Sequence, residues 1–160
     1  MKQTQTKTES ELSQWMKRVR QIAIEGVDRG EYPFGAGVFS IQGRELAISC
    51  NTVVSTNNPT AHAEINAIAA ACQVLGTANL EEHWLITTAE PCPMCMAAIA
   101  MAGIRLVAFG AIQAVVTEAG YGSLGMSGSE LASQFNHRIF IHGCIQGNEC
   151  VSLLLKNRKG

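Results

Sequence analysis

Two short motifs place a histidine, a glutamate and two cysteines at spacings that suit metal chemistry: His62-Ala63-Glu64 and Pro91-Cys92-Pro93-Met94-Cys95. Cys92 and Cys95 are three positions apart, so both thiols can face the same way on one helical turn. Pro93 is typical of the first turn of a helix. The positive end of a helix dipole favours thiolates, and thiolate is the form of cysteine that binds zinc.

His62 supplies a third donor for the same ion. It follows Pro59 and Thr60, and we expect it in the first turn of its own helix with Thr60 as the N-cap. A zinc ion with three protein ligands keeps a fourth position for water, which is the pattern of catalytic zinc sites. The sequence therefore predicts one zinc ion per chain, held by His62, Cys92 and Cys95.

Glu64 lies two residues after His62, and positions i and i+2 do not share a face of a helix. The arrangement works if the metal lies off the end of the helix, with water between the two side chains. Glu64 is then predicted to be a proton shuttle and not a ligand.

Other functions account for fewer of the residues in the two motifs. The Cys-x-x-Cys spacing also fits a redox dithiol, but a dithiol leaves His62-Ala63-Glu64 without a role. A closed structural zinc site needs a fourth ligand, and the remaining histidines lie in strand-like positions without ligand spacing: His83, His137 and His142.

The bulk composition indicates a single globular domain over residues 1–160, with residues 1–8 expected to be disordered. Hydrophobic residues make up 47% and charged residues 16% of the chain, and the net charge is −1. This balance gives no electrostatic footprint for nucleic acid. Lys156, Arg158 and Lys159 are expected to form a solvated tail. No apolar run is long enough for a membrane span, and the polar N-terminal residues lack the apolar core of a signal peptide, so a cytoplasmic location is expected. Thiols stay reduced in the cytosol, so we expect no disulfide framework among the six cysteines.

Hydrophobic periodicity and turn residues predict an alternation of helices and strands. The first helix shows an amphipathic stripe from Leu12 to Val27 behind a capping box at Thr8–Glu11. Further helices are expected at 61–75, 93–102 and 148–156, and strands at 35–41, 44–51, 83–89, 106–110 and 138–142. Residues 111–136 are expected to hold short helical pieces. A hairpin followed by βαβ units indicates an α/β fold with a mixed sheet and helices on both faces.

The motifs resemble those of the cytidine-deaminase-like superfamily of zinc deaminases. Residues 57–64 and 91–95, with Pro33-Phe34-Gly35-Ala36, look most like bacterial guanine deaminases. The resemblance implies a three-layer α/β/α sandwich with a five-stranded mixed sheet, and a homodimer. It places His62, Cys92 and Cys95 on the zinc ligands and Glu64 on the proton shuttle. It also places three residues against the substrate: Asn51, Phe34 and the backbone of Ala63.

The resemblance also predicts an acidic residue after the fourth strand, where Val115 stands in this chain. Glu118 occupies a neighbouring acidic position, and it is either a second shuttle or a solvated loop carboxylate. Residues 136–139 and 147–150 look more like tRNA adenosine deaminases. We therefore expect hydrolytic deamination of a free nucleobase, a nucleoside or a related small aminated ring, most simply a guanine-like one. The alternatives are a tRNA adenosine deaminase, a cytosine-type deaminase, and a non-catalytic zinc-binding member of the fold.

Overall fold

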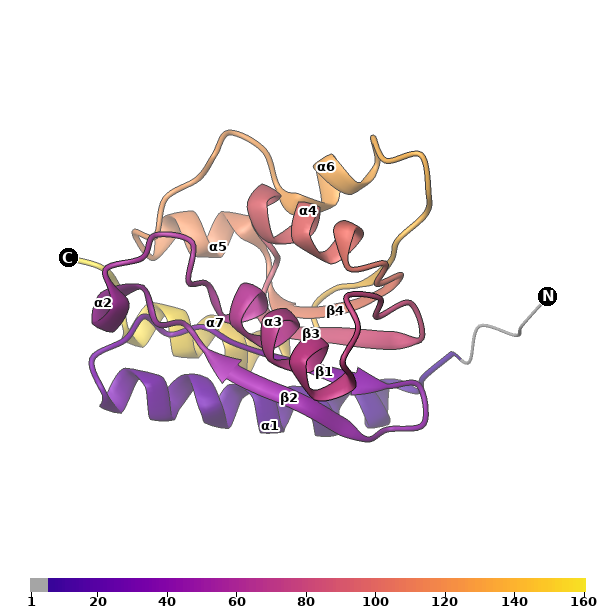
Figure 1. The fold of residues 1–160 in the computed structure, drawn as a ribbon. Helices are drawn as coiled ribbons and strands as arrows, with labels where there is room; N and C mark the ends of the chain where they lie inside the picture. Colours follow the sequence, from indigo (N-terminus) through magenta and orange to yellow (C-terminus); the bar gives the residue numbers. More distant parts are fainter. Residues whose placement is uncertain (1–5) are drawn as a thin grey trace.

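Residues 6–160 are described by the computed structural model, and they form a five-stranded sheet between two layers of helices (Figure 1). The strands follow the order β2-β1-β3-β4-β5. β1 is antiparallel to β2 and β3, whereas β4 is parallel to both β3 and β5. The expected mixed sheet is confirmed, with these bounds: β1 Gly35–Ser40, β2 Glu45–Cys50, β3 His83–Ala89, β4 Leu106–Ala111 and β5 Phe140–His142.

The two faces of the sheet are covered by different helices, which confirms the expected α/β/α layers (Figure 1). α1 (Glu9–Asp28), α5 (Gln113–Glu118) and α7 (Gly147–Lys156) pack on one face. α3 (Ala63–Leu75), α4 (Pro93–Met101) and α6 (Gly128–Ala132) pack on the other. A further short helix, α2 (Val53–Thr56), connects β2 toward α3. None of the helices in the described part of the chain is long and apolar enough to cross a membrane.

The central strand β3 shows why helices must cover both faces of the sheet. Trp84 and Ile86 point into the core beneath α1 and α7, whereas Leu85 between them points into the core beneath α3 and α4. Successive side chains of a strand face opposite sides of a sheet. From Trp84 to Ala89 the strand is buried and apolar, apart from two threonines whose hydroxyls are hydrogen-bonded: Thr87 donates to Glu64 and Thr88 accepts from the Gly35 amide.

The start of α1 follows the predicted capping box. The Thr8 side chain accepts a hydrogen bond from the Glu11 amide (3.2 Å), and the Glu11 carboxylate accepts one from the Thr8 amide (2.9 Å). Residues 1–5 of the segment expected to be disordered lie outside the described residues. Thr8 itself holds the beginning of the helix.

The strand directions bring three chain segments to one edge of the sheet. β2, β3 and β4 all run the same way, because β1 is antiparallel to both of its neighbours and β4 is parallel to β3. The residues that follow these strands, Asn51, Glu90 and Gln113, therefore lie at the same edge. In α/β sheets ligands bind outside the carboxyl ends of the strands.

Candidate active site and metal centre

A cavity of about 580 Å³ opens at this edge of the sheet. Asn51, Glu90 and Gln113 line it, together with His62, Glu64 and Cys92 from the two motifs. Its volume lies within the range of roughly 300–1,000 Å³ that is usual for small-molecule sites. The two motifs and the ends of three strands therefore share one concave site.

The two helix starts that carry the motifs have the same local design. His62 is the N-cap of α3 and Cys92 is the N-cap of α4, each with extended backbone, at φ −67° and −66°. Pro93 is the first residue of α4, as predicted, and Cys95 follows in its first turn. The prediction that Thr60 caps α3 is wrong, because His62 occupies the cap and the helix begins at Ala63. As the N-cap, His62 precedes the first turn of α3, and its side chain lines the cavity.

His62, Cys92 and Cys95 bring one nitrogen and two sulfur donors within 4.8 Å of one another. His62 Nδ1 lies 3.7 Å from the sulfur of Cys92 and 3.5 Å from the sulfur of Cys95. Tetrahedral zinc with usual bond lengths separates a nitrogen and a sulfur ligand by about 3.6 Å. The donor set and its spacing therefore fit zinc with three protein ligands.

The two thiols share a hydrogen bond that shifts their pKa values in opposite directions. The hydrogen bond between them lowers the pKa of Cys92 to about 4, with His62 adding to the effect. The same bond, together with burial, raises the pKa of Cys95. The hydrogen bond to Cys92 also raises the pKa of His62 against the opposing effect of its burial. Cys92 is therefore the more acidic of the two thiols.

Glu64 lies beside the ligands and almost out of contact with solvent, at 6% exposure. One carboxylate oxygen accepts a hydrogen bond from the Thr87 hydroxyl (3.1 Å), and the other accepts one from the Cys95 thiol (3.6 Å). Burial is the main cause that raises the pKa of Glu64 above its ordinary value. A buried carboxyl group with a raised pKa holds a proton more readily than an exposed one, which suits a group that passes protons to a bound reactant.

The residues predicted to contact a substrate are distributed around the cavity. Asn51 is buried, and its side-chain oxygen accepts a hydrogen bond from the Val53 amide (3.0 Å), which leaves its NH₂ group as a donor. Asn51 and Phe34 both line the cavity. Ala63 is buried and does not line it. Its amide belongs to the first turn of α3, where N–H groups lack intrahelical partners.

Glu118 lies outside the cavity lining, and its exposed carboxylate forms an ion pair with Arg158 (3.0 Å). Val115 packs against the core beneath α1 and α7 and does not line the cavity either. Of the two roles left open for Glu118, the solvated carboxylate matches this placement. The acidic side chains that do line the cavity are Glu64 and Glu90.

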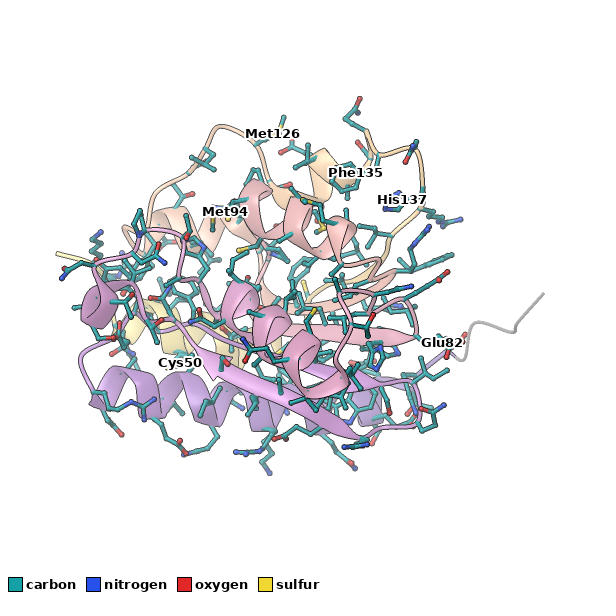
Figure 2. All side chains as sticks on the ribbon, viewed as in Figure 1. Cys50, Glu82, Met94, Met126, Phe135 and His137 are labelled. Carbon is teal, nitrogen blue, oxygen red and sulfur yellow. The ribbon has the colours of Figure 1, made fainter. Side chains whose placement is uncertain are left out.

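Several lining residues carried no signal in the sequence. Tyr32 and Tyr121 pack edge to face with ring centroids 5.4 Å apart, and both line the cavity beside Lys159. Met94, which belongs to the cysteine motif and is labelled at the start of α4 in Figure 2, lines the cavity as well. Tyr32, Tyr121 and Lys159 come from a loop before β1, a loop after α5 and the segment after α7. Only the tertiary fold brings such segments together.

Comparison with known proteins agrees with this geometry. The family model for the cytidine and deoxycytidylate deaminase zinc-binding region matches residues 9–111. The chain is 43% identical to guanine deaminase of Bacillus subtilis over 108 residues, which cover 67% of the chain and 69% of the relative. It is 33% identical to the tRNA-specific adenosine deaminase of the same organism over 151 residues, which cover 92% of the chain and 87% of the relative.

A solved structure of a protein called NE0047, in complex with 2,6-diaminopurine, has a similar fold. The TM-score is 0.83 at 26% sequence identity, and the match covers 92% of this chain and 81% of the other.

Proposed function

Because the chain belongs to the cytidine and deoxycytidylate deaminase family and is a zinc-dependent hydrolytic deaminase, we propose that its substrate is a purine or a closely related aminated ring, with guanine the first candidate. The observation that supports this most directly is the cavity of small-molecule size, which Glu64, His62 and Cys92 line, with Cys95 buried behind them within 4.8 Å of the other two donors. The guanine deaminase relative and the diaminopurine bound to the structural neighbour both favour a purine.

In this proposal His62, Cys92 and Cys95 hold the zinc. The neutral imidazole and the thiolate of Cys92 are donors that zinc prefers, and the positive ends of α3 and α4 favour the thiolates. When bound, zinc lowers the pKa of a water molecule toward about 7, so that hydroxide forms at neutral pH.

Glu64 moves the protons of the reaction. Its carboxylate takes one proton from the attacking water and delivers it to the ring nitrogen next to the amino-bearing carbon. It then takes the second proton from the hydroxyl group now on that carbon and delivers it to the amino group, which leaves as ammonia as the carbon–nitrogen bond breaks. The Thr87 hydroxyl donates a hydrogen bond to one of its oxygens and holds it in place. Because the side chain is buried, bulk water does not compete for these protons.

Asn51, Phe34 and the Ala63 backbone orient the ring. The free NH₂ group of Asn51 can donate to a ring nitrogen or a carbonyl oxygen. Phe34 offers an aromatic surface that packs edge to face against Tyr121, at 5.0 Å between centroids. The Ala63 amide, at the start of α3, is a donor near the metal end of the ring.

A tRNA substrate is the second candidate, because the tRNA-specific adenosine deaminase relative matches 92% of the chain. Proteins that bind tRNA usually neutralise phosphates with a basic surface. The net charge here is −1, which favours a small molecule.

Ammonia release from a panel of substrates tests the proposal. Zinc-loaded enzyme is incubated with guanine, guanosine, adenine, cytosine, cytidine and a tRNA anticodon stem-loop, with the Glu64→Gln variant as the matched control. We expect release from guanine or another free purine that the control lacks. Release from the stem-loop alone would replace the proposal with the tRNA function, and release from none would favour a non-catalytic zinc protein.

We further propose that two copies of the chain form a homodimer through α4. This helix contains no polar side chain apart from Cys95, yet four of its residues are half-exposed or exposed at helical spacing: Met94, Ala97, Ala98 and Met101. Met101 is 88% exposed. A helix that is apolar all round is normally buried, which calls for a partner over this side.

A cytoplasmic location is part of the same proposal. All six cysteines are free thiols, and two of them belong to the proposed zinc site. Thiols stay reduced in the cytosol, where such a site keeps its ligands.

A further inference from the structure

Lys159 contributes the one ammonium group to the cavity wall, among the residues that the structure describes. Lys159 is exposed, as expected for the solvated tail, and its backbone also bonds to Ala119, the residue after α5. Its Nζ lies 4.8 Å from the centroid of the Tyr32 ring, a distance that suits a cation–π contact. The side chain therefore belongs to the same space as Glu64 and Cys92.

The backbone of this segment is anchored at several points. The Lys159 amide donates to the Ala119 carbonyl (2.9 Å), and the Tyr121 hydroxyl donates to the Asn157 carbonyl. Arg158 adds an ion pair with Glu118 (3.0 Å) and a bond to its carbonyl (3.1 Å). Because these bonds anchor Asn157, Arg158 and the backbone of Lys159, the exposed lysine is kept beside the cavity.

Gly120 makes the close approach possible. Its φ is +88°, and a Cβ there would lie 2.7 Å from the Lys159 carbonyl oxygen. A residue with a side chain would push the segment away and would also be strained at this φ. The short contact between the two backbones therefore depends on glycine.

The ammonium group has no carboxylate partner in the described residues 6–160, where the ion pairs join other side chains. The two carboxylates that line the cavity are otherwise engaged. Glu64 accepts from Thr87 and Cys95, and Glu90 accepts from the Gln113 amide (2.9 Å). An exposed, unpaired cation on the cavity wall attracts an anion that enters the cavity, and salt screens this attraction.

We infer that Lys159 is a specificity-determining residue, which selects substrates whose aminated ring carries an anionic substituent such as a phosphate or a carboxylate. The inference rests on the proposed function, because the amino-bearing carbon must reach the metal ligands while the substituent meets Lys159. The cavity volume of about 580 Å³ leaves room for a ring and a substituent.

Matched pairs of substrates test the selection of charge. Guanosine and guanosine 5′-monophosphate differ by a phosphate, and pterin and pterin-6-carboxylate differ by a carboxylate. For the parent, kcat/KM is expected to be higher for the anionic member of at least one pair. Lys159→Met is expected to lower that value about tenfold, the size of one charge-assisted hydrogen bond. The loss falls on KM, and the neutral member changes by less than about twofold.

Conservative and control variants separate charge from structure. Lys159→Arg keeps the charge and is expected to restore most of the preference, whereas Lys156→Met, on an exposed residue outside the cavity lining, leaves it unchanged. The preference should also weaken as salt is raised. Equal losses for both members of each pair in Lys159→Met would overturn the inference.

A binding measurement distinguishes this inference from the proposed function. Calorimetry on zinc-loaded Glu64→Gln compares the affinities of the four ligands with and without Lys159→Met, and it needs no turnover. If the parent deaminates none of these rings but Lys159 still sets the affinity for the anionic ligands, the inference stands and the proposed function fails. If the affinities are insensitive to Lys159 while the parent deaminates a purine, the inference fails alone.

Discussion

Glu64 and Glu118, both considered as proton carriers, have opposite surroundings. Glu64 is 6% exposed and holds hydrogen bonds from Thr87 and Cys95. The Glu118 side chain is 58% exposed and pairs with Arg158. A proton shuttle must reach the reacting atoms and be shielded from bulk water, and only Glu64 meets both conditions. The two glutamates therefore serve as a variant and its control.

Glu64→Gln keeps the shape of the side chain and removes its ability to take up a proton. We expect kcat to fall by roughly 10² to 10⁴, the usual range for general acid–base catalysis. Elemental analysis should still find one zinc per chain, because Glu64 is not a ligand. Glu118→Gln should change kcat by less than about twofold, since an exposed ion pair contributes little. Parental turnover in Glu64→Gln would remove the shuttle from the mechanism.

At the scale of elements, α2 is held by a side chain from a distant loop. Glu31 is 8% exposed, and its two carboxylate oxygens accept hydrogen bonds from the amides of Val54 (3.1 Å) and Ser55 (3.0 Å). Val54 and Ser55 are the second and third residues of α2, whose own N-cap Thr52 makes no side-chain cap bond. Glu31 therefore satisfies the helix start in place of a local N-cap.

Glu31→Gln should lower the free energy of unfolding by about 1–2 kcal/mol at pH 7, because one acceptor and the charge at a helix N-terminus are lost. Burial alone would raise the pKa of Glu31, but the hydrogen bonds from Ser55 and Val54 outweigh burial and lower it. A lowered pKa stabilises the fold above the unfolded value of about 4.3, and this contribution disappears as the pH falls through the folded value.

Urea denaturation at several pH values measures this contribution. The difference between parent and Glu31→Gln should be constant above about pH 5 and should shrink at lower pH. Glu81→Gln, at an exposed position, is the control and should show no such difference. A difference that stays the same down to pH 3 would mean that the Glu31 carboxylate is not responsible.

The sequence predicted those elements whose signals are local. The capping box of α1, the buried run of β3, and the first turn of α4 behind Pro93 each depend on residues close together in the chain. The short α2 was not predicted, because its cap comes from Glu31. The N-cap of α3 was assigned to Thr60 from residue preference, although the site requires His62 there.

The same distinction between local signals and distant contacts explains which residues of the site could be predicted. The metal-binding residues and Glu64 were predicted because helix starts and short spacings fix them. Tyr32, Tyr121 and Lys159 could not be predicted, since their place on the cavity wall depends on how a loop and the segment after α7 fold over the sheet edge. A basic residue near the end of a helix gives no local signal for such a contact.

For the whole molecule, the proposed zinc site joins α3 to α4, so metal binding should stabilise the native state. Ligands that bind only the folded state raise stability by RT ln(1 + [L]/Kd), about 4 kcal/mol at a thousandfold excess over Kd. For a domain of this size we expect a chelator to lower Tm by roughly 10 °C. Calorimetric scans with and without chelator measure it, and Cys92→Ser should not respond. An unchanged parental Tm would contradict a folded-state zinc site.

The exposed apolar side of α4 is the reason to expect a second copy of the chain in the assembly. Its exposed side ends at Met101, which is 88% exposed, whereas Ile24, on α1 and across the sheet, is 37% exposed. A charge buried in an interface without a partner costs several kcal/mol. Met101→Glu and Ala98→Glu should therefore convert the dimer to a monomer, and Ile24→Glu should not.

Light scattering coupled to size exclusion measures the mass of each variant. Parent and Ile24→Glu are expected at twice the chain mass of 17.1 kDa, and the two α4 variants at one chain mass. If both α4 variants stay dimeric, the interface lies elsewhere, and a monomeric parent would mean that α4 tolerates its exposure. Because α4 also carries Cys92 and Cys95, a monomeric variant that loses zinc would further show that the contact between copies supports the metal site.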